Sequence, residues 1–224
     1  RANAVATDTG TLRSDFNTHN STTDNVLASI GVSTTIIFNQ ESPDISQRTY
    51  FLHDESTGLA STYRLLSSSP SNSAEVTWTL NSVTSAQNIV IISSHITLAN
   101  DPGVRKLPAG VWSFATWASA ASLTNISQLV ITVSTVSLSG DVVTEIVSAT
   151  TTILDIQPER YDMVALQAND VIVSTSDRIL VKYFVRSQSV LGVNMSIYYA
   201  GTTKFSHVNS PIGAIYKFTQ LADA

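Results

Sequence analysis

The chain has 224 residues, of which 13% are charged, with a net charge of −5 and no Cys. The lack of Cys excludes disulfide bonds and thiolate chemistry. The acidic balance, with its basic residues scattered along the chain, argues against binding of nucleic acid, which needs clustered Lys and Arg. No apolar run reaches the roughly 18–20 residues of a membrane helix, so we expect no insertion into a membrane.

The N-terminal part, residues 1–45, differs in character from the rest. Residues 1–11 are small and polar without periodicity, which indicates an arm. Apolar and polar residues then follow at alternating spacings of four and three, the pattern of a coiled-coil seam. We therefore predict an arm and short neck that serve attachment or trimerisation, and an irregular linker is the alternative. The residues expected at the trimer axis are Leu12, Phe16, His19, Val26 and Ile30.

From about residue 46 to the C-terminus the sequence predicts one all-β head domain, residues 46–224. Short apolar–polar alternations recur between turn signals at the spacing of a sandwich or barrel. The helical crossovers that a parallel sheet needs are absent. We therefore predict an antiparallel, jelly-roll-like β-sandwich. Its expected strands cover 48–53, 63–66, 76–80, 89–98, 111–119, 129–138, 142–149, 171–174, 179–186, 193–199, 204–208 and 214–218, with an irregular stretch at 157–170.

The stretch Val193–Pro211 carries the clearest local pattern. Val193, Met195, Ile197 and Tyr199 alternate with polar residues, as a half-buried strand requires. The sequence Ala-Gly-Thr-Thr at 200–203 then predicts a turn, in which Gly201 is free to adopt a positive φ. A second extended run follows, so we predict a β-hairpin.

Three segments in this order resemble the C-terminal β-sandwiches of phage and virus fibre or appendage proteins. They are Leu-Pro-Ala-Gly-Val-Trp-Ser-Phe at 107–114, Ser-Asp-Arg-Ile-Leu-Val at 176–181, and Gly-Thr-Thr-Lys-Phe-Ser-His at 201–207. They span about half of the chain. The resemblance implies a virion structural protein with an outward-facing trimeric head on the virion surface. It also implies that the N-terminal arm contacts other virion proteins.

No sequence motif names a chemistry. A Gly-x-Ser-x-Gly elbow, a P-loop and a His-Glu-x-x-His pair are all missing, and no His residues stand at paired metal-ligand spacing. We therefore expect no enzyme, no cofactor and no metal. Loop carboxylates are numerous enough for a glycosidase pair, but only their separation in space would decide that.

The aromatic residues offer candidates for contact with a partner or a glycan. Trp112 and Trp117 fall on opposite faces of one strand, so one of them faces outward. We expect core burial for Trp112 and Trp78, and a partner for Trp117, because a large exposed apolar side chain usually has one. The residues predicted to contact a partner or a host-surface glycan are Trp117, Tyr198 and His207.

The predicted function is a virion fibre, spike or decoration protein that contacts a host surface or a glycan. The alternatives are a secreted lectin-like carbohydrate-binding module and, third, a polysaccharide-degrading spike. A homotrimer is expected for three reasons. The charged fraction is about half the usual value for a soluble domain. The strand at 179–186 carries large apolar residues on both faces, Leu180 and Phe184 included, which suggests that a neighbouring subunit covers its outer face. The strand at 111–119 likewise carries a Trp on each face.

Overall fold

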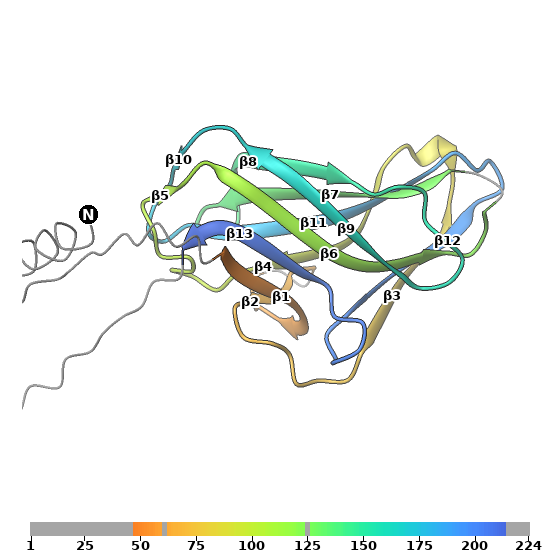
Figure 1. The fold of residues 1–224 in the computed structure, drawn as a ribbon, viewed down its shortest axis with the longest axis horizontal. Helices are drawn as coiled ribbons and strands as arrows, with labels where there is room; N and C mark the ends of the chain where they lie inside the picture. The colour runs from red at the N-terminus through yellow and green to blue at the C-terminus, as the bar shows by residue number, and fades with distance from the viewer. Residues whose placement is uncertain (1–46, 60–61, 124–125, 214–224) are drawn as a thin grey trace, which may run out of the picture. The chain divides into compact units, whose positions relative to one another are not determined.

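The computed structural model describes residues 47–59, 62–123 and 126–213 (Figure 1). These residues form β-strands and one short 3₁₀ helix, η1 (Ser85–Gln87), and no α-helix occurs among them. The neck residues Leu12, Phe16, His19, Val26 and Ile30, and the strand expected at 214–218, lie outside the described residues. The strands are β1 (Gln47–Ser56), β2 (Arg64–Ser67), β3 (Val76–Val83), β4 (Val90–Ile96), β5 (Lys106–Leu107), β6 (Gly110–Ala120), β7 (Ser127–Val136), β8 (Val142–Thr150), β9 (Glu159–Gln167), β10 (Val171–Ile172), β11 (Arg178–Ser187), β12 (Val193–Tyr199) and β13 (His207–Gly213).

The large sheet is continuous and folds over into two layers, which confirms the predicted all-β, sandwich-like class. Its order is β3-β12-β6-β13-β1-β2-β4-β11-β7-β8, with β9 paired to the free edge of β6. Figure 1 shows β9 and β6 crossing in front of β11. Every pairing is antiparallel except that of β2 with β4, which is parallel, so the sheet is mixed where the sequence led us to expect an antiparallel one.

The core lies between the two layers and follows from the alternation of the strands. Trp112 and Phe114 of β6 pack in one cluster with Val181 and Tyr183 of β11, all at most 1% exposed. Side chains of opposite parity on β6 point outward, and they include Trp117. Trp112 is therefore in the core, as predicted.

The outer face of β11 is covered by the chain itself near Leu180. Leu180 is 1% exposed and packs with Ile96 and Val136 in a second cluster, against Leu59 and Tyr63 of the loop between β1 and β2. A neighbouring subunit is therefore not needed to bury Leu180, which weakens one of the three reasons given for a trimer.

Trp78 does not lie in the core, contrary to prediction. It is 41% exposed, and the Arg64 guanidinium lies 5.4 Å from its ring centroid. The reason is its place in the sheet, because β3 ends the strand order and pairs only with β12. A side chain on such an edge strand can face the inner side of the sheet and still be exposed, because no further strand covers it on one side.

The predicted hairpin at residues 193–211 is wrong. β12 pairs with β6 through Met195–Tyr198, whereas β13 pairs with β6 through His207–Asn209. Both run antiparallel to β6 on the side opposite β9, so they lie end to end along one edge of β6. The residues between them, 200–206, leave the sheet as a loop. Its turn has the expected backbone, with φ of +66° at Gly201.

The stretch 157–170, expected to be irregular, contains strand β9. Tyr161 and Met163 point inward, while Val164 and Leu166 point outward and are 72% and 71% exposed. Apolar residues therefore stand on both faces, which hides the period-2 pattern that identifies a half-buried strand.

The ionisable ring of His95 in β4 is enclosed in the interior. It is 0% exposed, and its Nε2 lies 2.6 Å from Ser93 Oγ. Its ring meets those of Tyr183 and Tyr199 edge-on at 6.2 and 4.9 Å. Burial lowers the pKa of His95 to about 3, so the ring is neutral at pH 7.

Candidate functional site

The outer face of β6 brings together side chains from four strands. Antiparallel pairing places residues directly opposite each other on one face. Trp117 stands between Tyr198 of β12 and Arg160 of β9. Two residues earlier, Ala115 stands between His207 of β13 and Asp162 of β9. We call the set Trp117, Tyr198, Arg160, Asp162, Ala115, His207, Ser113 and Asn209 the β6 face.

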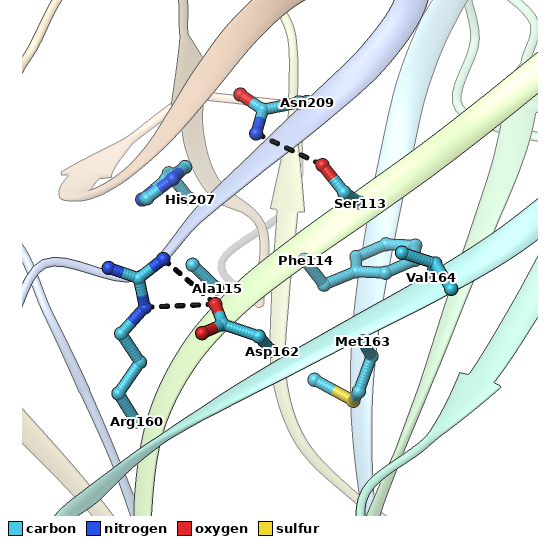
Figure 2. Close-up of a pocket in the computed structure, with 9 residues that line it drawn as sticks. All are labelled: Ser113, Phe114, Ala115, Arg160, Asp162, Met163, Val164, His207 and Asn209. Atoms are coloured by element: carbon cyan, nitrogen blue, oxygen red, sulfur yellow. Dashed lines mark hydrogen bonds and ion pairs between the residues drawn. The ribbon is translucent and has the colours of Figure 1, made fainter.

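A shallow hollow of about 180 Å³ opens on this face (Figure 2). It forms because Ala115 and Ser113, which have small side chains, lie between longer ones on β9 and β13. Figure 2 shows Arg160 and Asp162 on one side of the hollow and His207 and Asn209 on the other. The lining residues are Ser113, Phe114, Ala115, Arg160, Asp162, Met163, Val164, His207 and Asn209.

The polar groups of the hollow are held in place by one another. Arg160 and Asp162 form an ion pair, with 2.8 Å between Arg160 Nη2 and Asp162 Oδ1. Asn209 Oδ1 accepts from Thr49 Oγ1 at 2.7 Å, and Asn209 Nδ2 donates to Ser113 Oγ at 3.1 Å. The side chains therefore have fixed directions before any ligand arrives, which lowers the entropic cost of binding.

His207 belongs to an aromatic group at the edge of the hollow. Its ring is stacked on Phe205 at 5.4 Å and tilted against Phe51 at 5.9 Å. Burial lowers the pKa of His207 below its ordinary value, which favours a neutral ring at pH 7. Its buried Nδ1 has no hydrogen-bond partner among the described residues.

Trp117 and Tyr198 lie opposite each other on neighbouring strands next to the hollow, and both are half-buried. The Lys204 ammonium lies 5.0 Å from the centre of the Tyr198 ring and 3.0 Å from Glu75, which neutralises it. Ser206 fixes the backbone beneath, since its Oγ accepts from the Trp117 amide at 3.0 Å and donates to the Tyr198 carbonyl at 2.6 Å.

The structure thus places all three sequence-predicted contact residues, Trp117, Tyr198 and His207, on the β6 face. Sequence reasoning missed Arg160, Asp162 and Asn209. The alternation of Arg160 and Asp162 with the inward Tyr161 and Met163 is the signal that was available for two of them. No cluster of three or more His, Asp or Glu side chains that could hold a metal occurs within residues 47–59, 62–123 and 126–213. In the same ranges, no helix is long and apolar enough to cross a membrane.

No family model matches the sequence, and no curated protein matches it. Solved structures resemble the fold. A CocE/NonD family hydrolase from Staphylococcus aureus matches with a TM-score of 0.51 and 11% identity, over 75% of this chain and 36% of that one. An α-amino acid ester hydrolase matches with a TM-score of 0.47 and 11% identity, over 74% and 36%. An aminopeptidase from a marine sediment Thaumarchaeota archaeon matches with 0.47 and 9%, over 73% and 36%.

This chain therefore spans about a third of the length of the solved structures it matches. The comparison contradicts our prediction that the chain is not an enzyme. We excluded enzymes because familiar motifs were missing, yet the fold itself is shared with a hydrolase. At 11% identity the likeness extends to the fold alone, an all-β sandwich that also forms part of a hydrolase chain.

Proposed function

We propose that this β-sandwich is a recognition domain that binds a neutral, hydroxyl-rich ligand, such as a glycan on a host surface, on the β6 face. The observation that carries the proposal is the cross-strand pair of Trp117 and Tyr198 beside a polar hollow. Binding sites for small ligands combine apolar or aromatic surface with a few fixed polar groups. A sugar ring offers matching surfaces, because it has an apolar face and hydroxyls at its rim.

The charges on the face favour a neutral ligand. Arg160 is paired with Asp162, and Lys204 is paired with Glu75. Each positive charge is thus matched by a carboxylate, and His207 is neutral at pH 7. An ionic ligand would have to compete with these pairs, whereas hydroxyl groups can hydrogen-bond to both partners of an ion pair.

The size of the hollow, about 180 Å³, favours one sugar ring, since pockets for drug-sized ligands start at about 300 Å³. One such contact gives weak binding, and several copies on a rigid assembly would raise the overall affinity. This fits the predicted homotrimer, which stays a prediction, as do the virion-surface location and the attachment of residues 1–45 to other virion proteins. Sedimentation equilibrium of the full chain tests the oligomer.

A glycan array tests the proposal. We expect the wild-type chain to bind a set of glycans and Trp117→Ala to lose about tenfold or more of that affinity, as for other aromatic anchors. Trp78→Ala is the matched control, since it removes an exposed Trp that lies away from the β6 face. Wild-type protein that binds no glycan, or Trp117→Ala protein that binds like wild type, would contradict the proposal.

The bound glycans should also be assayed for release of reducing ends. Release of reducing ends would contradict a role in binding alone and would favour the third alternative drawn from the sequence, a polysaccharide-degrading spike. Binding without release, by a chain shown to act outside any virion, would favour the secreted lectin-like module.

A further inference from the structure

A second polar hollow, of about 340 Å³, lies on the other layer of the sandwich, away from the β6 face. Its walls come from the segment around η1, from β7 and from the end of β11. Apart from the apolar side chain of Ile126, every lining residue carries a hydroxyl, an amide or a guanidinium group. These residues are Ser85, Asn88, Ile126, Gln128, Arg186, Ser187 and Gln188.

Arg186 differs from the arginine of the β6 face in having no carboxylate beside it. It forms no ion pair with any described residue, and no Asp or Glu lines the hollow. The chain as a whole is acidic, with a net charge of −5. A cationic hollow without an internal counter-ion therefore stands out as a place for an external anion.

The guanidinium is nevertheless held in a fixed orientation. Arg186 stands opposite Gln128 in the register of β11 and β7. Gln128 Oε1 accepts from Arg186 Nε at 3.1 Å and from Nη2 at 2.8 Å. Gln128 is itself fixed, because its Nε2 donates to the Thr151 carbonyl at 2.9 Å. A neutral amide thus orients the guanidinium, and the described residues offer its positive charge no carboxylate and leave donors on Nη1 and Nη2 without a partner.

We propose that this hollow binds a sugar that carries a carboxylate, with the carboxylate paired to Arg186. The planar guanidinium matches a carboxylate in geometry and charge. The amides of Asn88 and Gln188 and the hydroxyl of Ser85 both donate and accept, so they suit the hydroxyls of a sugar. Ile126, which is 38% exposed, offers apolar contact to the ring. A bare inorganic anion would use neither the amide acceptors nor Ile126.

The test uses the ¹⁵N-labelled full chain, titrated with glucuronic acid, glucose, glucuronic acid methyl ester and sulfate, with affinities taken from amide shifts. We expect glucuronic acid to shift the amides around the hollow, with glucose and the methyl ester about tenfold or more weaker. Sulfate should bind more weakly than glucuronic acid. Arg186→Gln should abolish the preference for the acid. Arg186→Lys should retain part of it, because Lys keeps the positive charge but cannot form two parallel hydrogen bonds to a carboxylate.

Arg105→Gln, which changes an exposed Arg outside both hollows, is the matched control and should leave binding of glucuronic acid at this hollow unchanged. Because Arg186 is exposed, its variants should fold, which their unchanged amide spectra away from the hollow would confirm. The proposal is overturned if Arg186→Gln binds glucuronic acid like wild type, if glucose binds as tightly as the acid, if sulfate binds as tightly as the acid, or if none of the probes binds. The β6 face is tested separately by Trp117→Ala, so either proposal can fail alone.

Discussion

Gln167 accepts a hydrogen bond from the Trp112 indole inside the sandwich, with 2.9 Å between Trp112 Nε1 and Gln167 Oε1. The other end of the same amide, Nε2, donates to the carbonyls of Leu107 and Asn169 at 3.1 and 3.0 Å. The buried Gln167 side chain thus gives the indole N–H of Trp112, the largest fully buried side chain, its hydrogen-bond partner. It also connects β9 to Leu107, just before the turn into β6. Gln167 thereby helps to hold the register between β9 and β6, two of the four strands that form the β6 face.

We predict that Gln167→Leu lowers the free energy of unfolding by about 1–3 kcal/mol, the cost of leaving buried polar groups without partners. Urea unfolding followed by tryptophan fluorescence measures it. Gln188→Leu, an exposed change, should stay within about 0.5 kcal/mol of wild type. Equal midpoints for the two variants would show that the hydrogen bond to Trp112 does not stabilise the domain.

Gly110, the first residue of β6, has no room for a side chain. A Cβ at this position would lie 2.5 Å from the Cβ of Pro211 on β13. We therefore expect Gly110→Ala to destabilise the domain by about 1–3 kcal/mol, as overpacking does. Gly213→Ala is the control, because a Cβ added there would have no atom within 4 Å. Thermal unfolding of both variants checks the prediction, which fails if both shift the midpoint equally.

His95 should make the domain sensitive to acid. Its pKa is about 3 in the folded chain, against an ordinary value of about 6.5, so the unfolded chain takes up the proton first. Stability is then full above pH 6.5 and falls as the pH drops toward 3, by up to about 1.4 kcal/mol per pH unit. Urea unfolding between pH 7 and pH 5 isolates this effect from most carboxylates.

In His95→Gln the decline over the same pH window should be smaller, because His95 no longer titrates and only the contribution of His207, whose pKa is also lowered by burial, remains. A wild-type stability that does not change between pH 7 and pH 5 would count against the buried, neutral state of His95.

Trp112 and Trp78 should respond differently to truncation. Trp112 is 0% exposed and Trp78 is 41% exposed. Trp112→Ala should cost about 3–5 kcal/mol, as for other buried aromatic residues, whereas Trp78→Ala should cost about 1 kcal/mol. Denaturant midpoints measure both, and a larger loss for Trp78 would mean that β3 is not an edge strand in solution.

The sequence predicted individual strands well where one face is polar and the other apolar. The bounds of β12, Val193–Tyr199, are those that its alternation indicates. Strand β9 was missed because Val164 and Leu166 place apolar side chains on its exposed face. Alternation of apolar and polar residues reveals a strand only when one face is apolar and the other polar. A strand with apolar residues on both faces shows no alternation and looks like an irregular segment.

Pairing between distant strands was the part that local patterns could not supply. The sequence predicts the turn after Tyr199 from Gly201. The same turn fits two arrangements, a hairpin that reverses the chain, which we predicted, and a loop that leaves the sheet and returns to it, which the structure has. Likewise, alternation marked Trp117 as facing outward. Its neighbours Arg160 and Tyr198 depend on the register of β6 with two other strands, which is set by the packed core and not by residues nearby in sequence.

The end-to-end arrangement of β12 and β13 has a consequence for variation and engineering. Because β6 holds both strands in register, the connecting loop is not needed to set their alignment. Its two ends are fixed, by Gly201 against the backbone of Glu75 and by Ser206 against β6, while Thr202 and Thr203 are exposed. Residues inserted between those two threonines would extend next to Lys204, whose ammonium lies over the Tyr198 ring, without shifting the sheet. The domain therefore offers one position at which the ligand preference of the β6 face can be changed by lengthening a loop as well as by substituting residues.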